Sequence, residues 1–206
     1  MRIILTILIA FSFTTGSYAQ DTTYLLKVHF LYGSKPAKKY RDTERKWFGG
    51  KLGGHVGIEI NPDEILNFVP NGKFHVFGKK YNRHSAFAIH SVTGFYSIFG
   101  GHPDSVKKAI FYVPVTAQQK SRADSISVSY RQQTPYDYAF FGMRCGAAAY
   151  DILAQLEVVK EYKITKTSWK IFYPKKVRKR LLKKAKTNAW KVEITKGSTR
   201  RKWEKD

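Results

Sequence analysis

The chain has 206 residues, with 37 Lys and Arg against 15 Asp and Glu, and it contains one cysteine. This length suits one domain, and 43% hydrophobic residues suffice for a core, which excludes a wholly disordered chain. A single cysteine excludes a disulfide framework and a multi-cysteine zinc module. The net charge of +22 favours anionic partners such as nucleic acid, acidic lipid or an acidic polymer.

The first residues have the anatomy of a secretory signal peptide. Arg2 gives a positive start, an apolar run extends from Ile3 to Phe13, and Ser17-Tyr18-Ala19 ends the segment with small residues. The apolar run is much shorter than the roughly 20 residues that a membrane-spanning helix needs. We therefore expect residues 1–19 to be a signal peptide and the mature protein to be periplasmic or secreted. Export argues against nucleic acid as a partner, and we expect a monomer.

The alternation of β-forming residues with turn residues predicts an antiparallel sheet. A basic, glycine-rich loop over residues 32–54 follows the first strand, and three short runs after it have the spacing of a meander. Residues 79–103 show no clear periodicity apart from one strand. The expected strands cover residues 24–31, 55–60, 64–69, 73–78, 86–92 and 107–115.

Helices are expected mainly in the second half of the chain. The sequence Thr116-Ala-Gln-Gln119 matches a capping box and predicts a polar helix over 116–133. Apolar residues at helical spacing predict a buried helix over 146–156. A basic helix over about 174–186 and a strand over 190–195 complete an α+β pattern, an antiparallel sheet flanked by helices. Residues 196–206 are expected to form a tail.

The charge is concentrated near the C-terminus. Residues 161–206 hold 17 Lys and Arg against 4 Asp and Glu, so we divide the mature chain into a domain over 20–160 and a basic C-terminal extension over 161–206, packed on the domain or trailing it. A charge run of this kind is usually a solvated surface. The interleaved aromatic residues also suit an anionic polymer or lipid surface. These aromatic residues are Trp169, Phe172, Tyr173, Trp190 and Trp203.

The single cysteine, Cys145, stands where a loop meets the buried helix. At a helix N-terminus the free N–H groups and the helix dipole favour a thiolate, and the same N–H groups can hold an oxyanion. The alternative is a small core residue packed among the alanines that follow. A nucleophilic cysteine also needs a base, so the histidines must decide between these interpretations.

His55 is the best candidate for that base, because it opens a strand after Gly53-Gly54. The turn that follows brings Asn67, twelve positions further on, across from it, where an amide oxygen can fix the tautomer of the imidazole. His75 ranks second to Asn67 as the partner of His55. Cysteine, histidine and an orienting amide together make a papain-type triad.

These residues resemble a known family. The sequence His55-Val-Gly-Ile58, a polar residue twelve positions after the histidine, and a cysteine that opens a helix after Tyr136-Asp-Tyr138 look like the NlpC/P60 papain-like superfamily. The histidine precedes the cysteine, as in its circularly permuted members, and the resemblance covers residues 24–156. It implies a permuted papain-like fold, with Cys145 as nucleophile, His55 as general base and Asn67 as the orienting residue.

The resemblance leaves the substrate open. Many permuted relatives carry asparagine just before the cysteine, where this chain has Arg144. Tyr136 and Tyr138 either line the substrate cleft or belong to the aromatic core. No cofactor is expected. No metal site is expected either, since the spacing of His84, His90 and Asp104 matches no zinc motif.

The sequence therefore predicts an exported cysteine hydrolase of the amidase, peptidase or acyltransferase type. Its substrate is expected to be an amide or ester of the cell envelope, such as a wall peptide or a lipid. The basic C-terminal region is expected to contact an anionic polymer or lipid surface. The alternative is a non-catalytic cell-envelope binding module, with a degenerate papain-like fold and a basic aromatic surface.

Overall fold

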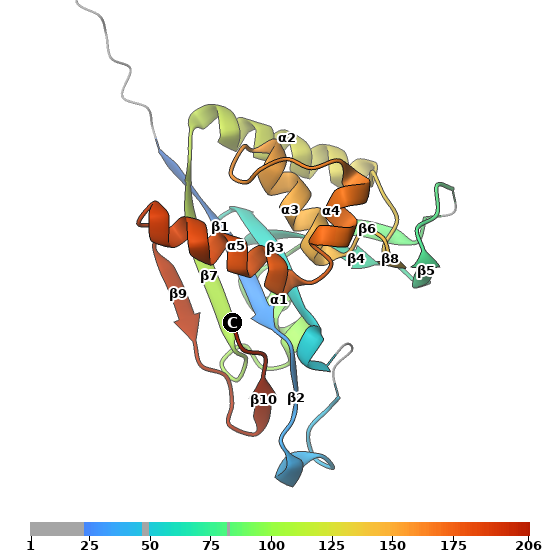
Figure 1. Ribbon diagram of the computed structural model, residues 1–206, viewed down its shortest axis with the longest axis vertical. Helices are drawn as coiled ribbons and strands as arrows, with labels where there is room; N and C mark the ends of the chain where they lie inside the picture. Colours follow the sequence, from blue (N-terminus) through green and yellow to red (C-terminus); the bar gives the residue numbers. More distant parts are fainter. Residues whose placement is uncertain (1–22, 47–49, 82) are drawn as a thin grey trace, which may run out of the picture.

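The computed structural model describes residues 23–46, 50–81 and 83–206, so the expected signal peptide lies outside the described residues. Six strands form one antiparallel sheet, which with the surrounding helices confirms the α+β class (Figure 1). In spatial order these strands are β6 (Ser85–His90), β4 (Glu64–Pro70), β3 (Gly54–Asn61), β1 (Tyr24–Tyr32), β7 (Lys108–Val115) and β9 (Val192–Thr195).

The two faces of the sheet are covered by different helices. Alternation along β1 sends Phe30 into the main core and Leu31 into a smaller cluster on the other face. The main core lies under α2, α3 and α5, whereas α1 covers the second face (Figure 1). The bounds of these helices are α1 (Val92–Gly100), α2 (Ala117–Gln132), α3 (Cys145–Gln155) and α5 (Pro174–Thr187).

The local signals at the two central helices are confirmed. Thr116 accepts from the backbone N–H of Gln119, and the Gln119 side chain accepts from the backbone of Thr116, so the capping box is complete. Helix α3 begins at Cys145 and is buried almost throughout, because its small alanine side chains let it lie close to the sheet.

The predicted meander of three strands is wrong in its third member. Strand β5 (His75–Phe77) leaves the sheet and pairs in parallel with β8 (Ala139–Phe141), while β6 takes the place beside β4. Strand β6 carries Phe87, whose ring lies 4.9 Å from that of Phe68 in the main core. Strand β5 offers little to that core, since Val76 and Phe77 are exposed.

Residues 32–54 and 79–103 contain more structure than expected. The first segment holds a short strand and two 3₁₀ turns, so it is not a featureless loop. The second holds α1, where the Ser91 side chain caps the helix by accepting from the backbone N–H of Gly94. The elements within 32–54 are β2 (Ser34–Pro36), η1 (Lys38–Tyr40) and η2 (Gly50–Leu52).

The C-terminal region is packed on the same unit, and the expected tail over 196–206 is wrong. Strand β9 extends the sheet beside β7, and β10 (Arg201–Trp203) pairs with β2. Arg201 Nε donates to the Ser34 hydroxyl at 2.8 Å, which joins β10 to β2 a second time. Helix α4 (Ile164–Lys170) connects the domain to α5. Within the described ranges, no helix has the length and apolar character needed to cross a membrane.

Candidate active site

His55 and Asn67 form the hydrogen-bonded pair expected from their spacing. Both side chains lie on the face covered by α1, and His55 Nε2 is 3.0 Å from Asn67 Oδ1. The Asn67 amide nitrogen donates to the Ala88 carbonyl at 3.1 Å and to His90 Nδ1 at 2.8 Å. These acceptors turn Oδ1 toward His55. The proton of the neutral imidazole therefore resides on Nε2, and Nδ1 is an acceptor.

Gly57 makes room for this pair. It lies between His55 and the middle of β3, and a Cβ placed on it would be 3.2 Å from Asn67 Cβ and 2.4 Å from Ile65 Cγ2. With hydrogen in that place, the Asn67 side chain reaches across the strand to the imidazole. The glycine in the His-Val-Gly-Ile sequence thus serves the geometry of the pair.

Aromatic rings surround His55. Its imidazole stacks on Phe99 with ring centroids 3.8 Å apart, and the centroid of Phe95 lies 5.5 Å away. Burial lowers the pKa of His55 to about 4, although the hydrogen bond to Asn67 acts in the opposite direction. The imidazole is therefore neutral at pH 7, with an unprotonated Nδ1.

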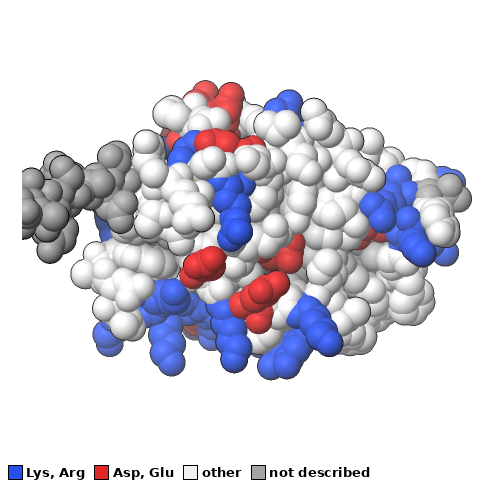
Figure 2. All heavy atoms as spheres, turned by 90° about the horizontal axis from the view of Figure 1, so that it is seen from above, with Lys and Arg blue, Asp and Glu red and all other residues white. Residues whose placement is uncertain are grey.

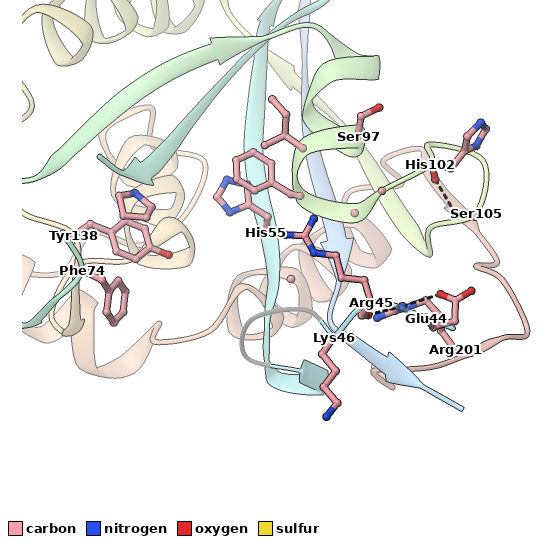
Figure 3. Close-up of a pocket in the computed structure, with 16 residues that line it drawn as sticks. Glu44, Arg45, Lys46, His55, Phe74, Ser97, His102, Ser105, Tyr138 and Arg201 are labelled. Carbon is pink, nitrogen blue, oxygen red and sulfur yellow. Dashed lines mark hydrogen bonds and ion pairs between the residues drawn. The ribbon is translucent and has the colours of Figure 1, made fainter. Parts of the chain in front are cut away.

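A pocket of about 640 Å³ opens at His55. Phe74 and Tyr138 form one side of it, and the end of α1 forms the other (Figure 3). Arg45 supplies positive charge at its rim and its side chain points into the pocket, whereas the ammonium of Lys46, which also lines the pocket, points away from it (Figure 3). The carboxylate of Glu44 in this lining is 2.9 Å from Arg201 Nη1. The pocket therefore presents a positive rim to a ligand.

Cys145 lies at the first residue of α3, as expected, but it is buried, with 4% of its surface exposed. Its thiol contacts the Tyr138 side chain and the backbone of Gly146 and Val56. Burial raises the pKa of the thiol, while the neighbouring Arg144 cation acts in the opposite direction. The resting cysteine is therefore a neutral thiol.

The thiol and the imidazole approach β3 from opposite sides. Cys145 and Val56 belong to the main core under α3, whereas the ring of His55 packs under α1. Within the described part of the chain, no hydrogen bond joins the thiol to His55. The structure thus brings His55 and Asn67 together and places Cys145 against the residue that follows His55, across the sheet.

The other residues singled out from the sequence lie in different places. Tyr138 lines the pocket, whereas Tyr136 is a core residue whose ring centroid lies 5.2 Å from that of Phe68. His75 hydrogen-bonds to Asp137, so it does not take the place of Asn67 beside His55. The described residues contain no group of three or more His, Cys, Asp or Glu side chains placed to hold a metal ion.

Sequence reasoning missed the environment of Arg144. Its guanidinium lies over the rings of Phe172, Tyr173 and Phe140, at 4.7, 5.4 and 5.5 Å from their centroids. Its Nε and Nη1 atoms are buried without hydrogen-bond partners among the described residues. The sequence feature that pointed to a role for Arg144 was its position directly before Cys145, which makes it the cation nearest to the thiol in the sequence.

Comparisons with known proteins give no relative. No family model matches the chain, and neither the curated proteins nor the solved structures contain a match. The relationship to the NlpC/P60 superfamily therefore stays a prediction that rests on the residues described above.

Proposed function

We propose that this protein is a cysteine hydrolase with a permuted papain-like fold that cleaves an amide or ester bond of the cell envelope. Cys145 is the nucleophile, His55 the general base and Asn67 the residue that orients the imidazole. The observation that carries the proposal is the His55–Asn67 hydrogen bond of 3.0 Å, because it leaves Nδ1 as a proton acceptor at the wall of a pocket.

The chemistry follows from these roles. His55 Nδ1 takes the proton of the Cys145 thiol, and the thiolate attacks the substrate carbonyl carbon. Backbone N–H groups at the start of α3 stabilise the oxyanion. The imidazolium then gives its proton to the leaving amine or alcohol, which departs as the C–N or C–O bond breaks and a thioester forms. Water, deprotonated by His55, hydrolyses the thioester and restores the thiol.

The reaction requires the thiol and Nδ1 to come within hydrogen-bond reach. Catalytic hydrogen bonds are often long before substrate binds and tighten in the reacting complex. Strand β3 begins at Gly54, directly before His55. Only the first residues of this strand therefore separate the Cys145 thiol from the His55 imidazole. The proposal therefore includes a rearrangement of the backbone at the start of β3 when substrate fills the pocket, which brings the thiol and Nδ1 within reach of each other.

The pocket indicates the charge of the substrate. Arg45, which points into the pocket, favours a substrate that carries a carboxylate or phosphate near the scissile bond (Figure 3). An anionic wall peptide or a lipid headgroup has this chemistry. The expected signal peptide places such substrates within reach of the mature protein.

The test is a comparison of three variants on cell-envelope fractions, with released amine and carboxylate groups measured by mass spectrometry. Cys145→Ala and His55→Ala should each abolish release. His102→Ala is the matched control, because His102 lines the same pocket but is exposed, and it should retain most of the activity. If Cys145→Ala releases as much product as the parent protein, the proposal is wrong.

A second candidate is a binding module without catalysis. The raised pKa of Cys145 and its placement across the sheet from His55 favour this reading. Under it, the pocket retains an anionic envelope ligand without changing it. Cys145→Ala would then bind envelope fractions as the parent protein does, and neither protein would release a product.

A further inference from the structure

Beyond the pocket, an exposed apolar surface extends over β5, β8 and α4. We call Val76, Phe77, Phe140, Phe141 and Trp169 the aromatic patch. Phe77 and Trp169 expose 65% and 73% of their surfaces. Apolar surface of this kind is costly to leave in water, and a contiguous patch on a folded protein marks an interaction site.

The rings of the aromatic patch contact one another although they come from distant parts of the chain. Parallel pairing of β5 with β8 sets Phe77 opposite Phe141, and their ring centroids are 5.6 Å apart. Trp169 of α4 stacks on Phe141 at 6.5 Å. The tertiary structure therefore assembles one surface from three separate segments.

Basic side chains flank the aromatic patch. Residues 73–83 around β5 and residues 164–170 of α4 contain no Asp or Glu. Their charged residues are Lys73, Lys79, Lys80, Arg83, Lys166 and Lys170, all exposed. Lys and Arg side chains gather at the end of the molecule where β5 lies (Figure 2). Exposed rings beside positive charges complement a surface that is apolar inside and anionic outside.

We propose that the aromatic patch docks the protein on an anionic lipid bilayer. Trp and Phe side chains enter the headgroup boundary of a membrane, and nearby Lys and Arg side chains bind anionic headgroups. Aliphatic Val76 of the same patch is 57% exposed, and Ile164, at the start of α4, is 51% exposed. Exposed aliphatic side chains favour a lipid over a polysaccharide, because they can be buried among hydrocarbon chains, whereas a sugar ring stacks on aromatic rings alone.

This docking surface adjoins the pocket. Phe74 lines the pocket, and its ring centroid lies 6.5 Å from that of Phe140 in the aromatic patch. Docking would bring the pocket close to the headgroup layer. The proposal does not depend on the chemistry of Cys145, so its test measures binding alone.

The experiment is co-sedimentation of the chain lacking residues 1–19 with vesicles made of phosphatidylglycerol and phosphatidylcholine in equal parts. We expect the protein to bind these vesicles and to bind vesicles of pure phosphatidylcholine much more weakly. The double variant Phe77→Ser/Trp169→Ser should lower the binding constant at least about tenfold, because two rings no longer enter the interface. Its matched control, Leu25→Ser/Val128→Ser, changes two residues of similar exposure elsewhere and should bind as the parent does.

A second pair of variants separates local charge from total charge. Lys79→Glu/Lys80→Glu lies beside the aromatic patch, and Lys179→Glu/Lys183→Glu makes the same charge change on the exposed side of α5. The first pair should weaken binding much more than the second. Equal weakening by both, or binding to an acidic polysaccharide with none to the vesicles, would overturn the proposal.

Discussion

Arg178 and Glu204 form a buried ion pair, with Nη2 and Oε2 2.7 Å apart and 0% and 5% of their side chains exposed. Arg178 Nε also lies 2.7 Å from Asp206 Oδ1, and the guanidinium sits over the ring of Tyr32 at 3.7 Å. These contacts join α5 to β1 and to the last residues of the chain. The few acidic residues of the basic C-terminal region thus pair with its own Arg178, and the Tyr32 hydroxyl, which donates to Asp206 Oδ2 at 2.9 Å, joins the region to the sheet.

Deleting residues 204–206 should therefore destabilise the whole protein. The deletion leaves the Arg178 guanidinium buried without its carboxylates, which should lower the free energy of unfolding by about 3–5 kcal/mol. Urea unfolding followed by circular dichroism measures this loss. Adding Arg178→Met to the shortened chain should recover part of it, because the unpaired charge is gone. Equal stability of the shortened and full chains would contradict the prediction.

Stability should fall when the pH is lowered from about 6.5 to 4. The pKa of His55 is lowered to about 4 in the folded protein, so the unfolded chain binds the proton first in this window. The stability attached to His55 is complete above its unfolded pKa and should decrease by on the order of 3 kcal/mol by pH 4. Burial also lowers the pKa of His29 and His90, so both add to this slope.

The matched measurement is urea unfolding at several pH values for the parent protein and for His55→Gln. The variant should show a shallower pH dependence, because one of the three histidines no longer contributes. The same slope in both proteins would show that His55 is not held neutral by burial.

Gly57→Ala should destabilise the protein and disturb the His55–Asn67 pair. The added Cβ would lie 2.4 Å from Ile65 Cγ2 on β4 and 3.0 Å from Phe95 Cε2 on α1, which are packed against each other. Overpacking of this kind costs about 1–3 kcal/mol. Gly78→Ala is the control, because a Cβ there meets no atom within 4 Å. Thermal unfolding should show a lower midpoint for the first variant and an unchanged one for the second.

The thiol of Cys145 should react slowly with iodoacetamide at pH 7 in the absence of substrate. Its pKa is raised by burial, so labelling should increase only above the ordinary thiol value of ~8.5. Arg144→Gln should move the labelling midpoint to higher pH, since the arginine acts to lower the pKa. Mass spectrometry of the labelled protein against pH gives both midpoints, and a midpoint below the ordinary value would contradict a neutral resting thiol.

Local signals in the sequence predicted much of the fold correctly. The capping box at Thr116, the apolar spacing after Cys145 and the turn at 61–63 act between near neighbours, so they can be read without the tertiary structure. The hydrogen bond between His55 and Asn67 belongs to this group, because one turn joins their two strands. The spacing of twelve residues between His55 and Asn67 was informative because β4, which carries Asn67, pairs directly with β3.

Only the tertiary structure decided which elements become neighbours and which face each side chain joins. Strand β5 pairs with the distant β8, and β6, which carries the buried Phe87, takes the place beside β4. Cys145 and His55 lie on opposite faces of the sheet. Alternation along β3 points Val56 toward Cys145 of α3 and points His55 toward α1. The aromatic patch and the ion pairs of Arg178 also join segments that are distant in the sequence. Contacts between residues distant in sequence depend on competition among many possible partners, and no single segment encodes its result.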